Sequence, residues 1–232
     1  MHLRKPEIDY RRVRFTAIHT AEYKHLKLLL FWPMFGMLFQ FVEHFYQVES
    51  YTVMHCALDD WIPFCEWFLI PYLFWFFYMG GIFVYTLLYD IDGFCRMMKY
   101  IMLTYSITIV IYLLWPTCQE LRPDTFLREN VLTEITKAYY RFDTNTNVCP
   151  SIHVIGSLAV MEAALWSKKF SKAWKASFVF IAILICMSTV FMKQHSVLDI
   201  LAALPICAVG HCFWFRTAKT HRLVMRIFYT VH

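Results

Sequence analysis

Two stretches organise this chain: Asn147-Val148-Cys149-Pro150-Ser151-Ile152-His153 and Lys193-Gln194-His195-Ser196-Val197-Leu198-Asp199. Each places polar or ionisable side chains at the mouth of an apolar segment of helix length, where a simple membrane anchor would carry leucine or phenylalanine. Such side chains cost free energy in a membrane unless they are paired or functional. His153 and His195 are 42 residues apart in sequence, so the fold decides whether they meet.

The composition around these stretches is that of a membrane protein. Of the 232 residues, 59% are hydrophobic and 17% are charged, against roughly 45–50% and about 25% in soluble domains. A single soluble core of this size cannot bury so much apolar surface. We therefore predict an all-α polytopic membrane protein, and the composition argues against a disordered, collagen-like or nucleic-acid-binding chain.

Six apolar segments approach the roughly 20 residues that a helix needs to cross a bilayer. They cover residues 28–48, 67–89, 100–119, 150–166, 174–192 and 197–216. The fourth is short and is interrupted by Glu162. We expect one bundle of six transmembrane helices over residues 28–216, between a basic N-terminal arm at 1–27 and a basic tail at 217–232.

The distribution of cations predicts the orientation of this bundle. If the N-terminus is cytoplasmic, 17 of the 22 Lys and Arg residues lie on the cytoplasmic side, a strong positive-inside signal. Arg122-Pro123, Pro150–His153 and Lys193–Asp199 then share the opposite face. We expect cytoplasmic termini, a site at the extracytoplasmic interface and, since no cleavable signal is evident, a bacterial plasma membrane.

The histidines and the aspartate suit nucleophilic catalysis. His195 and Asp199 are four residues apart, so on a helix they share a face. The carboxylate can hold one imidazole nitrogen protonated and leave the other as a nucleophile. His153, in the first turn of the fourth helix, can protonate a leaving oxygen.

Other residues in these segments suit binding of a phosphoryl group. The Ser151 hydroxyl, with the backbone amides of a helix N-terminus, can cradle an anion. Arg122 and Lys193 can neutralise its charge. We therefore predict phosphoryl transfer through a covalent phosphohistidine, with no cofactor and no metal site implied, since the protein itself supplies the positive charge.

Plainer interpretations exist for several of these residues. Asp199 can interact only with the helix dipole, Arg122 can be one more loop cation, Lys193 can snorkel and Ser151 can be a simple cap. Asn147 can cap the fourth helix or line the site, and the residues leave both open. The segment 119–149 is a candidate lid or acceptor-binding region.

The ordered set of Arg122-Pro123, Pro150-Ser151-Ile152-His153 and Ser188…His195…Asp199 resembles the three signature motifs of the type 2 phosphatidic acid phosphatase superfamily. The resemblance extends over about residues 60–210. It implies six helices with the site opposite the N-terminus. It also implies that His195 is the nucleophile, His153 the general acid and Asp199 the group that orients the nucleophile.

Three positions depart from the family pattern. Trp115 stands where the family has Lys, Ile152 where it usually has Gly, and Thr189 where it usually has Arg. Lys193, two residues before the nucleophile, is similar instead to the sphingomyelin synthase and inositol phosphorylceramide synthase branch, whose members move phospho-headgroups between lipids.

The sequence thus leaves three functions open. The first is a lipid-phosphate phosphatase, and the alternative is a headgroup phosphotransferase that uses the same residues with a lipid alcohol as acceptor. A non-catalytic transporter or scaffold is less favoured, because both histidines and Asp199 are present. The expected partners are a lipid phosphate or phospholipid substrate and the bilayer.

Overall fold

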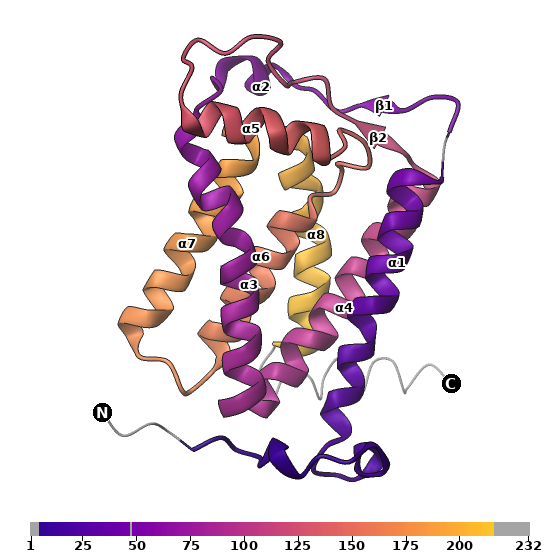
Figure 1. Ribbon diagram of the computed structural model, residues 1–232, viewed down its shortest axis with the longest axis vertical. Helices are drawn as coiled ribbons and strands as arrows, with labels where there is room; N and C mark the ends of the chain where they lie inside the picture. The colour runs from indigo at the N-terminus through magenta and orange to yellow at the C-terminus, as the bar shows by residue number, and fades with distance from the viewer. Residues whose placement is uncertain (1–4, 47, 216–232) are drawn as a thin grey trace.

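The chain is almost entirely helical in the computed structural model, which describes residues 5–46 and 48–215 (Figure 1). The α-helices are α1 (Phe31–His44), α2 (Ala57–Trp61), α3 (Leu69–Tyr89), α4 (Ile91–Leu114), α5 (Val131–Phe142), α6 (Ile152–Trp166), α7 (Lys172–Phe191) and α8 (Val197–Trp214). Short 3₁₀ helices cover Tyr10–Arg12, Phe15–His19, Lys24–Leu30 and Glu66–Phe68. Two short strands, β1 (Thr52–Val53) and β2 (Thr117–Cys118), pair in parallel, with Thr52 opposite Thr117.

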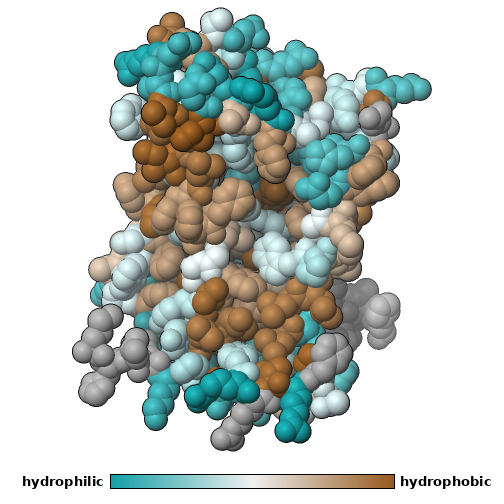
Figure 2. Space-filling model, in the orientation of Figure 1, coloured by the Kyte–Doolittle hydropathy of each residue, from teal (hydrophilic) through white to brown (hydrophobic). Residues whose placement is uncertain are grey.

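Five helical segments in the described part of the chain are long and apolar enough to cross a bilayer: Lys24–His44, Glu66–Tyr89, Ile91–Leu114, Lys172–Phe191 and Val197–Trp214. The protein is therefore an integral membrane protein. The remaining predicted segment, 150–166, forms the apolar helix α6, which has only 15 residues. Hydrophilic side chains gather at the two ends of the molecule, and hydrophobic ones cover much of the height between them (Figure 2).

Helix α6 lies at the centre of the bundle and contacts α3, α4, α7 and α8. Small residues let its neighbours approach closely. A Cβ atom at Gly156 would lie 2.6 Å from the Tyr105 hydroxyl and 3.0 Å from the Trp75 ring. Since protein surrounds α6, it does not need the length of a lipid-exposed span, which explains why it is short.

Helix α4 begins at Ile91, whereas the predicted segment covers 100–119. The hydropathy pattern missed the first turns of α4 because they carry charged residues. Asp90 caps it by accepting a hydrogen bond from the Gly93 amide at 3.1 Å. Arg96 donates to the Trp214 carbonyl at 2.7 Å and lies 4.2 Å from the Trp166 ring. These contacts place a cation on a helix where hydropathy alone predicts a loop.

The two ends of the bundle have different coverings (Figure 1). At one end, the N-terminal arm packs against the end of α3, and the Tyr10 hydroxyl donates to the Leu87 carbonyl at 2.7 Å. At the other end, the predicted lid segment 119–149 contains the amphipathic helix α5, which packs on α3 through Tyr72 and Tyr139. The predicted tail at 217–232 lies outside the described residues.

The packing around α6 gives a stability prediction. Gly156→Ala should lower the free energy of unfolding by about 1–3 kcal/mol, because the added methyl group clashes with Tyr105 and Trp75. Thermal unfolding in detergent would measure the loss. Gly81→Ala is the matched control, since a Cβ atom there meets nothing within 4 Å. Equal melting temperatures for the two variants would contradict the packing described here.

Candidate active site

His195 and Asp199 form a buried pair at the start of α8. The Nδ1 atom of His195 lies 3.0 Å from Oδ2 of Asp199, as the four-residue spacing predicts. The same carboxylate oxygen accepts a hydrogen bond from the Ser196 amide at 3.0 Å, and the Ser196 hydroxyl caps the helix in return. The carboxylate therefore fixes both the helix start and the orientation of the imidazole.

The turn before α8 holds His195 from the other side. The backbone amides of Gln194 and His195 both donate to the Thr189 carbonyl, at 3.0 and 3.1 Å. Asp59, from α2, accepts hydrogen bonds from the Ser196 hydroxyl at 2.5 Å and the Val197 amide at 2.8 Å. Burial alone would raise the pKa of Asp59, but these bonds and one from the Cys56 amide lower the pKa overall.

His153 lies in the first turn of α6, and the fold brings it to His195. The ring centroids of the two histidines are 5.8 Å apart. Tyr72 and Trp75 of α3 hold the His153 ring between them, at centroid distances of 4.7 and 4.6 Å. Neither ring nitrogen of His153 has a hydrogen-bond partner among the described residues, although the side chain is buried. Buried polar groups are nearly always satisfied, so these nitrogens are available to a ligand or to water.

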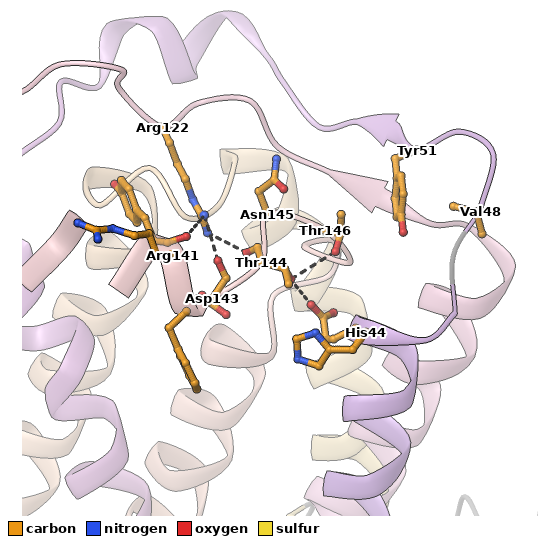
Figure 3. A pocket seen from close by; sticks show the side chains of 12 residues that line it. His44, Val48, Tyr51, Arg122, Arg141, Asp143, Thr144, Asn145 and Thr146 are labelled. Atoms are coloured by element: carbon orange, nitrogen blue, oxygen red, sulfur yellow. Dashed lines mark hydrogen bonds between the residues drawn. The ribbon is translucent and has the colours of Figure 1, made fainter. Parts of the chain in front are cut away.

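A small cavity lies beside the histidines, and a larger pocket is next to it. A cavity of about 40 Å³ touches both His153 and His195, and this volume suits a few water molecules. A larger pocket of about 650 Å³ opens outside it (Figure 3). Four residues line both spaces: Glu43, Asp143, Thr144 and Thr146. The segment 143–146 therefore separates the outer pocket from the histidines.

Arg122 extends into the outer pocket and holds this segment in place (Figure 3). Its guanidinium donates to the carbonyls of Tyr140, Asp143 and Thr144 at 2.8–3.1 Å. It also donates twice to Oε1 of Gln194, at 3.1 and 2.5 Å. All its donor groups are engaged, so a phosphate can bind Arg122 only by replacing one of these acceptors.

A comparison with known protein families agrees with this geometry. The sequence profile of the PAP2 superfamily matches residues 96–223, more than half of the chain, and the match contains Arg122, His153, His195 and Asp199. The chain belongs to the PAP2 superfamily. Membership indicates a phosphatase-type activity on lipid substrates in a membrane. Searches of curated proteins and of solved structures found no match.

Two other residues predicted to bind phosphate have different partners in this PAP2 protein. The Lys193 ammonium donates to the Asp59 carbonyl at 2.6 Å and does not line the cavity at the histidines. Burial lowers the pKa of Lys193, and Asp59 and Asp60 oppose that shift. The Ser151 hydroxyl caps α6 by accepting from the Val154 amide at 3.4 Å, and the Ser151 amide donates to the Asp199 carbonyl at 3.2 Å.

Of the three departures from the PAP2 pattern, Ile152 lines the cavity at the histidines, whereas Trp115 and Thr189 make structural contacts. The indole of Trp115 donates to the Thr52 hydroxyl at 2.9 Å, beside the paired strands. Thr189 is buried, its hydroxyl donates to the Cys186 carbonyl at 2.8 Å, and its own carbonyl supports the turn before His195. Neither residue lines the cavity at the histidines.

Two carboxylates beside the histidines are absent from the sequence prediction. Glu43, at the end of α1, accepts a short hydrogen bond from the Thr144 hydroxyl, and its other oxygen has no partner among the described residues. Asp143 lies 3.3 Å from the Gln194 amide nitrogen. The only sequence signal for Glu43 is that it ends an otherwise uncharged run, and nothing local marks Asp143. Within residues 5–46 and 48–215, no three His, Cys, Asp or Glu side chains group as metal ligands.

The environment of Asp143 predicts a pH-dependent stability. Burial raises the pKa of Asp143, and the nearby Arg122 and His195 offset this only in part. An acid whose pKa is raised by folding destabilises the native state when it is ionised, and the penalty disappears as pH falls through the folded-state pKa. Asp143→Asn should therefore raise the melting temperature at neutral pH, and its advantage should shrink in acid.

The matched control for this comparison is Asp124→Asn, at an exposed position in the same segment. It should leave the melting temperature unchanged throughout the pH series. A constant difference between Asp143→Asn and the wild type at every pH would show that Asp143 does not titrate as the structure predicts.

Proposed function

We propose that this PAP2 superfamily protein is a lipid-phosphate phosphatase that hydrolyses a phosphate monoester or diphosphate of a lipid through a phosphohistidine at His195. The observation that supports this most is the arrangement of the three predicted catalytic residues. His195 is paired with Asp199 and packs against His153, with ring centroids 5.8 Å apart, and neither nitrogen of His153 has a hydrogen-bond partner among the described residues.

The first half of the reaction transfers the phosphoryl group to the enzyme. Nε2 of His195 attacks phosphorus while Asp199, on Nδ1, stabilises the positive charge that develops on the ring. The bond between phosphorus and the lipid oxygen breaks. His153, in its protonated form, gives its proton to this oxygen, and the lipid alcohol leaves.

The second half returns the enzyme to its starting state. Water attacks the phosphorus of the phosphohistidine, and His153, now neutral, takes the proton from the water. The phosphorus–nitrogen bond breaks, phosphate is released and His195 is restored. The cavity of about 40 Å³ that both imidazoles line has room for this water.

Arg122 is the proposed phosphate ligand, supported by the Ser151 hydroxyl and the N-terminus of α6. An anionic phosphate oxygen forms stronger hydrogen bonds with the Arg122 guanidinium than a neutral amide oxygen does. In this structure the Gln194 amide oxygen accepts hydrogen bonds from Arg122. Phosphate can therefore displace Gln194, which precedes the nucleophile. Lys193 joins the phosphate only if it releases the Asp59 carbonyl.

One observation favours a second function, transfer of a phospho-headgroup to an alcohol. Glu43 and Asp143 line the cavity at the histidines. Carboxylates accept hydrogen bonds from hydroxyl groups and repel phosphate, so they suit an alcohol acceptor better than an anionic group. In this reaction His195 would carry the whole phospho-headgroup after the donor's lipid alcohol leaves, and a second lipid alcohol instead of water would attack its phosphorus, which breaks the phosphorus–nitrogen bond and restores His195.

The proposed topology has six spans, with α6 as the short central one. The termini are cytoplasmic and the histidines face the extracytoplasmic side, in a bacterial plasma membrane. The support is the distribution of Lys and Arg along the chain, together with the positions of the N-terminal arm and the histidines at opposite ends of the bundle.

A turnover assay tests the proposed chemistry. Purified protein is incubated with phosphatidic acid, a prenyl diphosphate and phosphatidylcholine, with and without isotope-labelled diacylglycerol, and both free phosphate and labelled phospholipid are measured. His195→Ala should lower turnover by at least about 10³-fold, and Asp199→Asn by about 10²–10⁴-fold. His55→Ala, at an exposed histidine, is the control and should keep full activity.

The products distinguish the two functions. Free phosphate supports the phosphatase, and a new phospholipid formed only with diacylglycerol supports the transferase. Turnover that survives in His195→Ala would rule out the phosphohistidine, and the absence of turnover with every donor would overturn both functions.

Cysteine labelling tests the topology. In a variant without native cysteines, Leu127→Cys should react in intact cells with a membrane-impermeant maleimide, because Leu127 is fully exposed in the segment 119–149. Lys168→Cys, exposed between α6 and α7, should react only after the cells are opened. The reverse pattern would contradict the proposed orientation.

A further inference from the structure

Asn147 is a polar residue beside the histidines that the proposed reaction leaves without a role. The helix cap that the sequence allowed it to form is made by Ser151 instead. Asn147 lines the cavity that both histidines line. Its side chain is buried, and neither Oδ1 nor Nδ2 has a hydrogen-bond partner among the described residues. Buried polar groups are nearly always satisfied, so this amide is available to a ligand or to water in the cavity.

The backbone at Asn147 is left-handed, with φ at 52°. Its N–H donates to the Thr117 carbonyl at 2.5 Å, which fixes the residue to strand β2. Asparagine tolerates this conformation better than most residues. An asparagine that served the backbone alone would not need a buried amide, whereas 95% of this residue is covered, since its exposed fraction is 5%. The conformation therefore accounts for the backbone and leaves the side chain unexplained.

Glu43 brings a second unsatisfied group to the same cavity. Its Oε2 atom accepts a hydrogen bond from the Thr144 hydroxyl, but Oε1 is buried and has no partner among the described residues. The Glu43 carboxyl and the Asn147 amide are neighbours, without a hydrogen bond of normal geometry between them. With the two nitrogens of His153, three side chains therefore contribute unpartnered polar atoms to the lining of a space of about 40 Å³.

These polar groups match a water molecule that attacks phosphorus. Such a water uses one lone pair for the new bond and has one lone pair and two hydrogens left. The Asn147 Nδ2 group can donate to the lone pair, neutral His153 can take one hydrogen, and Glu43 Oε1 can accept the other. A phosphate oxygen fits less well, because a carboxylate accepts hydrogen bonds and repels an anion.

We propose that Asn147 and Glu43 hold the water that hydrolyses the phosphohistidine. The inference rests on the proposed function, because it assigns a position to the nucleophile of the second half of that reaction. As the water oxygen bonds to phosphorus, the bond from phosphorus to Nε2 of His195 breaks and its electron pair returns to Nε2. One hydrogen of the water passes to His153. The other stays on the phosphate product, where Glu43 accepts it.

The two halves of the reaction depend on Asn147 and Glu43 to different extents. In the first half, covalent bonds to phosphorus and carbon hold the leaving oxygen, which has no second hydrogen in need of an acceptor. In the second half, the water is a free molecule, so only hydrogen bonds fix its position and orientation. Loss of either residue should therefore slow the hydrolysis of the phosphohistidine and not its formation.

Asn147→Gly tests this directly, because glycine keeps the left-handed backbone and the bond to Thr117 while it removes the amide. Protein in detergent is mixed with phosphatidic acid that carries a radioactive phosphate. Diacylglycerol, protein-bound phosphate and free phosphate are then timed after rapid quenching. Asn147→Gly should form the phosphohistidine at nearly the wild-type rate. It should hydrolyse it about 10²-fold more slowly, since a misplaced reactant costs about this factor. Radioactive phosphate should therefore accumulate on the protein.

Two other variants complete the test. Glu43→Leu removes the acceptor at a similar volume and should accumulate the label in the same way. Asn130→Ser is the control, because it also removes an amide, but Asn130 caps α5 and does not line the cavity, and serine can replace it as a cap. This control should behave as the wild type. An unchanged rate of phosphohistidine formation shows that a variant is folded.

Three results would overturn the inference. Asn147→Gly could hydrolyse the phosphohistidine at the wild-type rate. It could instead lose formation and hydrolysis equally, as expected for a residue that binds phosphate or only supports the fold. In the third case, the wild type releases no diacylglycerol and carries no label. That result is the failure of the proposed function itself and removes this inference with it, and it is recognised from the wild type alone.

Discussion

The hydrogen bond between His195 and Asp199 is the interaction on which the rest of the site depends. The Asp199 oxygen that binds His195 also accepts a hydrogen bond from the Ser196 amide. The same carboxylate therefore orients the imidazole and forms part of the cap at the start of α8. Asp59 holds the same turn from outside by binding Ser196 and Val197. The proposed nucleophile, His195, is therefore held in place by the same hydrogen bonds that satisfy the free amides at the N-terminus of α8.

The position of α6 supplies the second half of the site. Protein surrounds this helix, and its glycine and alanine residues let the Tyr105 hydroxyl and the Trp75 ring approach its backbone. Because α6 starts beside α8, with the Ser151 amide bonded to the Asp199 carbonyl, His153 faces His195. The helix that is too short for an ordinary span is the one that places the second histidine.

Local patterns made the apolar helices and the contact between His195 and Asp199 predictable from the sequence. The apolar runs mark the spans, and a four-residue spacing is enough to pair His195 with Asp199. Contacts between distant segments were not predictable. Arg122 was expected to be free for phosphate, but backbone carbonyls and Gln194 engage its donors, and carbonyls leave no trace in a sequence. Glu43 reaches the cavity from the end of α1, about a hundred residues before its partner Thr144.

Segment 143–146 lies between the cavity at the histidines and the polar outer pocket. In the proposed reaction the lipid alcohol returns to the bilayer after it leaves, because apolar chains avoid polar surface. The acceptor of the proposed second half then reaches the histidines past Glu43 and Asp143, which line both spaces. On this proposal segment 143–146, and not the histidine chemistry, governs whether water or an alcohol completes the reaction.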